Sequence, residues 1–207
     1  MNDTRSWVTA TYQGLADLLT AAGDEVWSAQ SLCARWSVRE VVAHVTMPVR
    51  MTPERFQVEI AAAGGDFTML SDTVAARDAA LPIPALVSQL RSSELHGWLP
   101  PGGGAAGALS HAVIHSLDVT SALGRPAVAP IEAMTAVLDQ LAAARGALFG
   151  IDATGVRWEA VDTGWTWGEG TLLRADTGQL VALLGGRSLP GGPVLPSGVR
   201  QRTTETG

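Results

Sequence analysis

An apolar stretch in the middle of the chain, residues 109–118, constrains the fold more than any other feature. Its sequence is Leu-Ser-His-Ala-Val-Ile-His-Ser-Leu-Asp, which places His111 and His115 four residues apart. On a helix this spacing puts both side chains on one face, about one turn apart, where two imidazoles can reach one metal ion. The stretch therefore predicts a helix whose histidine-bearing face meets other helices at a ligand site.

A metal site needs at least a third ligand, and His44 is the candidate. Ser37 and Glu40 have the spacing of a capping box, which predicts a helix that begins at Val38 with His44 in its second turn. Pro48 removes a helical hydrogen bond and predicts a bend just past the histidine. A hydrogen-bonded place in the core is the ordinary alternative for any single histidine. Three of the four histidines nevertheless fall at helix positions that can converge.

Helical spacing, with proline and glycine breaks, defines the remaining elements. We predict helices at residues 4–22, 53–63, 84–96, 105–123, 131–148 and 177–184, and a loop with some helical content at 66–82. Alternation over residues 156–161 and the segment Trp165-Thr166-Trp167 predict a small sheet. The expected fold is mainly α, a four-helix bundle with an additional helix and a small C-terminal α+β domain. The expected divisions are 1–126, 127–187 and an irregular or disordered tail at 188–207.

Composition limits the functions that this chain can have. The net charge is −6 and the pI is near 5.1, so nucleic acid is not an expected partner. All 14 basic residues are arginines, which excludes Schiff-base and P-loop lysine chemistry. Cys33 is the only cysteine, and a small apolar filler is favoured over a catalytic thiol. The sequence shows neither a signal peptide nor a membrane-spanning stretch, so we expect a cytoplasmic protein.

Several short motifs, in a fixed order, resemble the DinB-like superfamily of metal-binding four-helix proteins. The motifs are residues 36–44, the pattern His111-x-x-x-His115-x-x-Asp118, and residues 123–126, 165–170 and 178–187. Over residues 5–187 the sequence is more narrowly similar to the actinobacterial family of mycothiol-dependent maleylpyruvate isomerase-like proteins. The resemblance implies a DinB-like bundle with a divalent metal held by His44, His111 and His115. Water or a low-molecular-weight thiol would complete the coordination.

The resemblance also implies an enzyme of transferase or isomerase type. Its cosubstrate would be mycothiol, its substrate a small electrophile, and its metal zinc, with nickel or iron as alternatives. The isomerase of this family has a glutamate at the position of His111, so His111 is compatible with metal binding but weakens the case for maleylpyruvate as substrate. A metal-dependent hydrolase, for which Glu40, Asp118 and Glu169 are poor candidate bases, and a non-catalytic metal- or small-molecule-binding module are the alternatives. The composition is compatible with a homodimer.

Asp118 and Arg187 are the candidate catalytic residues. Asp118 falls on the helical face of His115 and can accept the second N–H of a ligating histidine; the alternative is a carboxylate that faces solvent or an arginine. Arg187 matches the Gly-Arg end of the resembled C-terminal domain, where a guanidinium would suit a substrate carboxylate. A surface arginine after a helix is the alternative. His96 is expected at the surface or as a cap.

Overall fold

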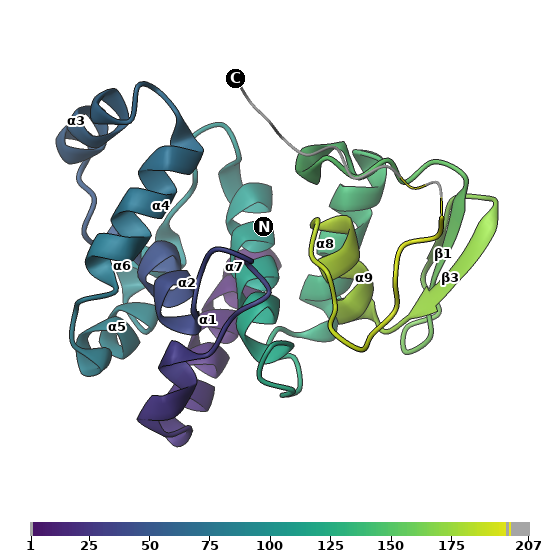
Figure 1. The fold of residues 1–207 in the computed structure, drawn as a ribbon, viewed down its shortest axis with the longest axis horizontal. Coiled ribbons are helices and arrows are strands. Elements are labelled where there is room, and N and C mark those ends of the chain that lie inside the picture. The colour runs from purple at the N-terminus through teal and green to yellow at the C-terminus, as the bar shows by residue number, and fades with distance from the viewer. Residues whose placement is uncertain (1, 198, 200–207) are drawn as a thin grey trace.

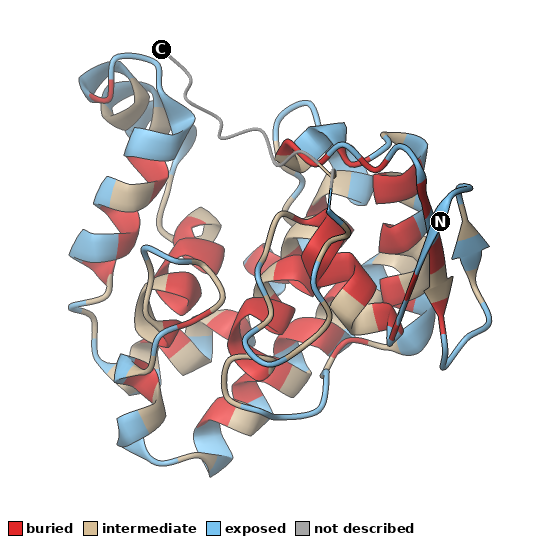
Figure 2. Ribbon diagram, turned by 45° about the vertical axis from the view of Figure 1, so that its right-hand side comes forward, coloured by how far each residue is buried: buried red, intermediate tan, exposed pale blue. Residues whose placement is uncertain are grey.

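Four helices surround a common core in the computed structural model, which describes residues 2–197 and residue 199 (Figure 1). They are α1 (Asn2–Ala21), α2 (Val38–Val45), α5 (Ile83–Leu90) and α7 (Gly104–Thr120). Around the core, α1 contacts α7, α7 contacts α2, α2 contacts α5, and α5 contacts α1. Their inward faces are buried (Figure 2). The predicted fold class, a mainly α protein built on a four-helix bundle, is confirmed.

The histidine-bearing helix α2 forms where the capping pattern predicts it. The Ser37 side chain accepts from the Glu40 backbone N–H, and the Glu40 carboxylate accepts from the Ser37 backbone N–H at 2.7 Å. The helix ends at Val45, and Pro48 lies in the following 3-10 turn η2 (Met47–Val49). The predicted break is therefore confirmed. It places His44 in the last turn of the helix, at the edge of the bundle core.

The loop expected at residues 66–82 is wrong, because this segment contains the regular helix α4 (Phe67–Asp78). The Asp66 carboxylate caps its first turn, accepting from the Thr68 N–H at 2.7 Å. Polar and apolar residues share its buried face, which consists of Leu70, Ser71, Val74, Ala75 and Asp78. The buried polar residues interrupt the apolar pattern on which the sequence prediction depended.

Two other predicted helices differ in length from the observed ones. The segment 84–96 divides into α5 and α6 (Ser93–Gly97), because the Ser92 hydroxyl caps a new start by accepting from the Leu95 N–H at 3.2 Å. The helix predicted over 131–148 ends early, as α8 (Ile131–Ala143), and Gly146 then adopts a left-handed φ of 75° before the 3-10 turn η3 (Ala147–Phe149). Helix α3 (Pro53–Ala62) agrees with its prediction.

A small sheet follows the helices, as predicted. Strands β1 (Val156–Ala160), β2 (Thr166–Trp167) and β3 (Thr171–Ala175) have the order β2-β1-β3, with β1 antiparallel to β2 and parallel to β3. Strand β1 alternates between buried and more exposed positions and contacts α9 (Thr177–Leu184). Helix α9 packs on both α8 and α7, which attaches this part to the bundle.

One hydrophobic cluster runs from the bundle into the C-terminal part, so the division at residue 126 stays a prediction. Residues 188–197 and 199 of the predicted irregular tail contain no helix or strand. The remaining tail positions lie outside the described residues. Among the helices that the structure describes, none is long and apolar enough to cross a membrane.

A buried ion pair joins α4 to the turn after α2. Arg50 Nη2 lies 2.9 Å from Asp78 Oδ2, and Arg77 Nε lies 2.7 Å from Asp78 Oδ1. Burial raises the pKa of Asp78, but the hydrogen bonds from Arg77 and Arg50 outweigh burial and hold the pKa below its ordinary value. A carboxyl with a depressed folded-state pKa stabilises the fold above its unfolded-state pKa, and this contribution is lost as the pH falls through the folded-state value.

We therefore expect the free energy of unfolding of the Asp78→Asn variant to change less with pH in the acid range than that of the parent protein. At about pH 7 the variant should lose about 2 kcal/mol of unfolding free energy, because Arg50 stays buried without its charged partner. Near pH 3 and below, the difference from the parent protein should shrink, because Asp78 becomes protonated there. Urea unfolding followed by circular dichroism measures both quantities. The control is Asp17→Asn, which removes an exposed pair with Arg91. A loss for Asp78→Asn that does not change with pH would contradict the prediction.

Candidate active site

His44 from α2 and His111 and His115 from α7 meet between the two helices. The centroids of their imidazole rings lie 4.8–5.2 Å apart. One ring nitrogen from each residue lies within 4.8 Å of the other two, and His44 Nε2 is 3.2 Å from His111 Nε2. The structure thus brings together the three residues that the sequence predicts as metal ligands. Their role as ligands stays a prediction.

Hydrogen bonds fix the ring nitrogens of two of these histidines. His115 Nδ1 lies 2.9 Å from Asp118 Oδ2, and because a carboxylate only accepts, Nδ1 must donate; in the neutral ring this leaves a lone pair on Nε2. His111 Nδ1 lies 3.0 Å from the Tyr12 hydroxyl. In the tautomer whose Nδ1–H donates to the phenol oxygen, His111 Nε2 carries a free lone pair, as His115 Nε2 does.

The nitrogen geometry fits a divalent cation. With this tautomer of His111, its Nε2 accepts at 3.2 Å from a His44 Nε2–H, or, when both Nε2 atoms are unprotonated, the two lone pairs face one another and a cation can bind between them. Two nitrogens bound to one tetrahedral zinc ion are expected at a similar separation, about 3.3 Å. Burial, reinforced by the neighbouring imidazoles, lowers the pKa of His44 and His111 well below the ordinary value, which favours the neutral form that binds metals. Three imidazoles suit zinc, nickel, iron or copper.

Trp36 covers one side of the histidine cluster. Its ring centroid lies 4.6 Å from that of His44 and 6.2 Å from that of His115. The indole N–H donates to Asp72 Oδ1 at 3.0 Å, which ties the loop before α2 to α4. The tryptophan therefore shields the imidazoles from solvent and restricts their motion.

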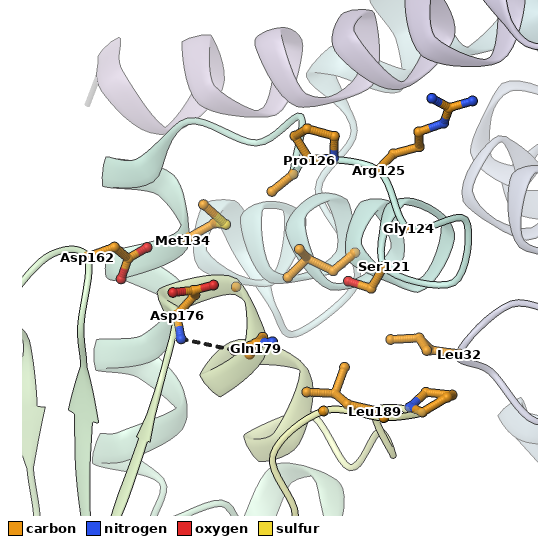
Figure 3. A pocket seen from close by; sticks show the side chains of 16 residues that line it. Leu32, Ser121, Gly124, Arg125, Pro126, Met134, Asp162, Asp176, Gln179 and Leu189 are labelled. Atoms are coloured by element: carbon orange, nitrogen blue, oxygen red, sulfur yellow. Dashed lines mark hydrogen bonds between the residues drawn. The ribbon is translucent and has the colours of Figure 1, made fainter.

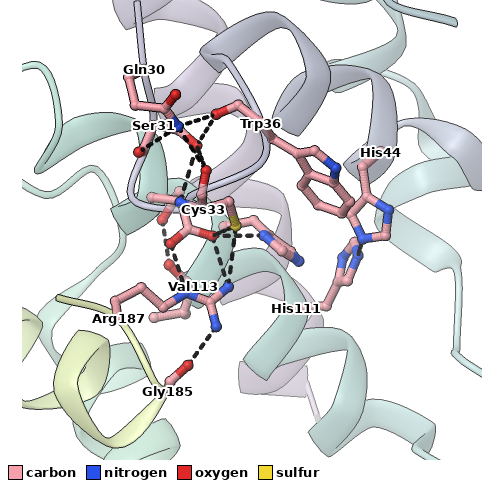
Figure 4. A network of polar contacts seen from close by, with 12 residues as sticks. Gln30, Ser31, Cys33, Trp36, His44, His111, Val113, Gly185 and Arg187 are labelled. Carbon is pink, nitrogen blue, oxygen red and sulfur yellow. Dashed lines mark hydrogen bonds and ion pairs between the residues drawn. The ribbon is translucent and has the colours of Figure 1, made fainter. Parts of the chain in front are cut away.

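Asp118 and Arg187 form a buried pair beside the histidines. Figure 4 shows Arg187 in the polar network that also includes Cys33. The side chains of Asp118 and Arg187 are 1% and 13% exposed; Arg187 Nε donates to Oδ1 at 2.8 Å and Nη2 donates to Oδ2 at 2.9 Å. Burial raises the pKa of Asp118, but the hydrogen bonds from Arg187 and His115 reverse this effect and hold the pKa well below its ordinary value. Asp118 is therefore ionised and links His115 to Arg187. The contact predicted between Asp118 and a histidine N–H is present.

The end of α9 explains how Arg187 reaches this position. The Gly186 N–H donates to the Leu183 carbonyl at 3.0 Å, and the Arg187 N–H donates to the Ala182 carbonyl at 2.9 Å. This is a Schellman motif, and Gly186 has the left-handed φ of 79° that the motif requires. The motif turns the chain back so that Arg187 enters the protein. The alternative of a surface arginine is therefore wrong.

Cys33 contacts the same pair from the loop before α2. Its thiol donates to Asp118 Oδ2 at 3.1 Å, and the backbone N–H of Leu32 donates to the Asp118 carbonyl at 3.0 Å. Burial and the Asp118 carboxylate raise the pKa of Cys33 to about 12. The side chain is therefore a neutral thiol near pH 7, which argues against a catalytic nucleophile. The Cys33 side chain therefore donates a hydrogen bond and also packs as a small side chain.

A cavity of about 870 Å³ opens onto the three histidines. Its largest apolar lining residues are Met47, Phe67, Trp98, Ile114, Leu148 and Phe149. Trp98 places its ring edge-on to His111, with centroids 5.3 Å apart. Ser110 and Gln140 add a neutral polar pair, in which the Ser110 hydroxyl donates to Gln140 Oε1 at 2.6 Å. The volume suits a small organic ligand.

Another cavity, of about 620 Å³, lies between the end of α7 and the C-terminal part (Figure 3). Arg125, Asp162, Asp176 and Gln179 contribute its polar groups. Asp162 accepts from the Thr177 backbone N–H at 2.9 Å, and Asp176 belongs to the capping box of α9. Its polar groups thus serve local structure, and its lining includes none of the histidines.

Sequence reasoning missed the residues that support the site from other elements. Tyr12, the only tyrosine in the chain, follows the helical spacing of α1, and that spacing does not distinguish it from the apolar residues of the same face. Burial raises its pKa far above the ordinary value, so the phenol stays protonated. Of the two positions expected for His96, the surface one is wrong, because the residue is 8% exposed and its ring stacks near Tyr12. Its Nε2 lies 2.8 Å from the carbonyl of Leu90, the last residue of α5, which fits the capping alternative.

The bundle and its converging histidines define a DinB-like protein with a candidate metal centre. Residues 8–96 match the family described as the mycothiol maleylpyruvate isomerase N-terminal domain. Residues 8–96 are therefore similar to this family's N-terminal domain, in agreement with the family that the sequence resembles. Comparison with curated protein sequences finds no match.

Two solved structures resemble the whole chain. A crystal structure of a histidine-to-alanine mutant of the mycothiol-dependent maleylpyruvate isomerase aligns with a TM-score of 0.55 and 12% identity, over 93% of this chain and 91% of that one. A second crystal structure of the mycothiol-dependent maleylpyruvate isomerase aligns with a TM-score of 0.49 and 14% identity, over 100% and 94%. At this level of identity, the first alignment establishes a shared fold.

Removal of the Tyr12 hydroxyl should weaken metal binding. Tyr12→Phe retains the ring but leaves His111 Nδ1 without its partner, so we expect the affinity for Zn²⁺ to fall about tenfold. Competition with a chromophoric chelator measures this affinity. Thr11→Val is the matched control, because the Thr11 hydroxyl bonds only to the Trp7 carbonyl of the same helix. Equal affinities for Tyr12→Phe and the parent protein would contradict the prediction.

The Asp118–Arg187 pair should show strong coupling in a double-mutant cycle. Arg187→Gln leaves a buried carboxylate without its cation, and we expect it to cost about 3 kcal/mol of unfolding free energy. Adding Asp118→Asn removes that unpaired charge and should restore part of the loss. Urea unfolding with a chelator present measures the cycle without a contribution from bound metal. Losses that simply add would show that the two side chains do not stabilise one another.

Proposed function

We propose that the protein is a metal-dependent enzyme that uses a low-molecular-weight thiol, mycothiol, to add sulfur to a small electrophile or to isomerise it. The observation that carries the proposal is the convergence of His44, His111 and His115 at the floor of an apolar cavity. The match of residues 8–96 to the mycothiol maleylpyruvate isomerase N-terminal domain supports the thiol and the class of reaction. His111 favours an electrophile other than maleylpyruvate, because the resembled isomerase has a glutamate there.

The residues around the cavity have separate tasks in this proposal. His44, His111 and His115 hold a divalent cation, which when bound favours the thiolate form of a thiol and polarises a carbonyl oxygen. Asp118 fixes the tautomer of His115, and Tyr12 does the same for His111. Arg187 balances the charge of Asp118, so that no uncompensated carboxylate faces the incoming thiolate.

The reaction needs no further group from the protein as a nucleophile. The thiol loses its proton to solvent before the cavity is filled, and its sulfur adds to the β carbon of an α,β-unsaturated carbonyl compound. A C–S bond forms and the π electrons move to the carbonyl oxygen. Protonation at the α carbon then completes S-transfer. Rotation about the new single bond, followed by loss of the thiolate, instead returns the thiol and an isomerised double bond. The apolar cavity excludes competing water.

Hydrolysis is less well supported because it needs a general base near the cation. None of the described residues that line the cavity is acidic. Glu40 caps α2, Asp118 is paired with Arg187, and Glu169 is exposed on the segment between β2 and β3. A non-catalytic binding module is the remaining alternative, and turnover experiments separate it from an enzyme.

Metal content is the first test. Protein purified without an affinity tag should contain about one divalent ion per chain, and His44→Ala, His111→Ala and His115→Ala should each abolish or strongly reduce it. Mass spectrometry of the metal gives the stoichiometry. The control is Ser116→Ala on the same helix, because the Ser116 hydroxyl bonds only to the Val113 carbonyl. Metal-free parent protein, or full metal content in all three variants, would exclude the proposal.

Turnover is the second test. The metal-loaded protein should accelerate consumption of an α,β-unsaturated carbonyl compound in the presence of mycothiol, and His111→Ala should lose this activity. Bound metal without turnover of any electrophile would favour the binding module. Turnover that does not require thiol would favour the hydrolase.

A further inference from the structure

We propose that the substrate electrophile has an uncharged, apolar body, aromatic or bulky aliphatic, at the end remote from the histidines. This inference rests on the proposed function and adds the substrate class. It differs from the expectation that Arg187 binds a substrate carboxylate. The observations that carry it are the existing partners of Arg187 and the apolar wall of the cavity.

Arg187 has few donors left for a substrate. It is the only arginine among the described residues that line the cavity. Nε and Nη2 donate to the two oxygens of Asp118, Nη1 donates to the Gly185 carbonyl, and Nη2 also contacts Cys33 Sγ. One Nη1–H remains, so a substrate carboxylate could form the two-point contact that suits a guanidinium only by displacing the buried carboxylate of Asp118, which also accepts from His115. The guanidinium is therefore a structural partner of Asp118.

Among the residues that the structure describes, those that form the wall beyond the histidines carry no other charge. Met47, Phe67, Trp98 and Leu148 line it, and Phe67 and Leu148 are 54% and 67% exposed. A neighbouring cavity of about 670 Å³ shares Met47, Phe67 and Trp98 and continues outward past Met51 and Phe56. A carboxylate placed against these side chains would lose hydration and gain no partner. An apolar group would instead bury hydrophobic surface on both sides.

The polar groups of the wall fit a neutral substrate. The Ser110 hydroxyl donates to Gln140 Oε1, and Gln140 Nε2, which forms no hydrogen bond with another described residue, can donate to a neutral acceptor. A cation held by the histidines can balance one negative charge at the reacting end. The second carboxylate of a dicarboxylate such as maleylpyruvate would then face Trp98 and Leu148. The cavity therefore favours a ketone, aldehyde or ester with an apolar substituent.

A matched pair of electrophiles tests the inference. Benzylideneacetone and its para-carboxy analogue share the same enone and differ in charge at the remote end. With metal-loaded protein and mycothiol, we expect kcat/KM to be about tenfold or more higher for the neutral compound, after correction for the uncatalysed reaction. Equal values, or preference for the carboxylate, would overturn the inference while leaving the proposed function intact.

Substitution at the wall gives a second readout. Leu148→Arg adds a cation at an exposed position of the lining and should shift the kcat/KM ratio about tenfold toward the para-carboxy compound. Leu148→Gln adds a neutral side chain and should not produce that shift. Val161→Arg adds the same charge at an exposed position outside the cavities and should leave the ratio unchanged. A ratio that Leu148→Arg does not change would count against this wall as the binding surface.

Binding of unreactive analogues separates failure of the inference from failure of the proposed function. Benzylacetone and its para-carboxy analogue lack the reactive double bond, and titration followed by NMR measures their affinities directly. Tighter binding of benzylacetone, without turnover of any enone, would reject the enzyme and retain the apolar site. Equal or tighter binding of the carboxylate would overturn the apolar site, whatever the activity.

Discussion

The ionised carboxylate of Asp118 is the interaction on which the arrangement of the site depends. It is buried inside α7 and accepts hydrogen bonds from three directions: His115 on its own helix, Cys33 on the loop before α2, and Arg187 after α9. A carboxylate this deeply buried is tolerated only when it is paired. Docking of the C-terminal part onto the bundle therefore satisfies a charge that also orients a candidate metal ligand. Stability and site geometry depend on the same contacts.

Local patterns predicted the parts of the site that single elements determine. The Ser37–Glu40 capping box fixed the start of α2, and the spacing of His111 and His115 placed both imidazoles on one face of α7. These features depend on backbone geometry within a few residues, so sequence alone specifies them. The prediction of a loop with some helical content at residues 66–82, where α4 forms, failed because a contact with a distant residue decides the structure there. Asp78 is buried there because Arg50, which is distant in the sequence, provides a partner.

The sequence alone could not identify the partners of Tyr12 and Arg187, because those partners lie on distant elements. Tyr12 bonds to a residue 99 positions away, and Arg187 to one 69 positions away. Nothing in the neighbourhood of either residue signals its partner, since a tyrosine at a core position of α1 has the same spacing whether or not its hydroxyl meets a histidine. His96 shows the same limit: its position at the end of α6 suggests exposure, but packing on α1 buries it. Which residue such a side chain contacts is therefore decided only by how the helices pack in the folded bundle.

Charge balance at the cavity floor connects the site to its chemistry. The three imidazoles are neutral ligands, and Arg187 and Asp118 cancel each other, so the described residues that line the cavity contribute almost no net charge toward a bound cation. In the proposed function, His111 stands where the resembled isomerase has a glutamate, so the floor lacks one negative charge that would repel a thiolate. The apolar side chains of the outer wall would disfavour a second carboxylate. Under this proposal, the site binds the thiolate at its floor and selects electrophiles by the apolar surface that they bury.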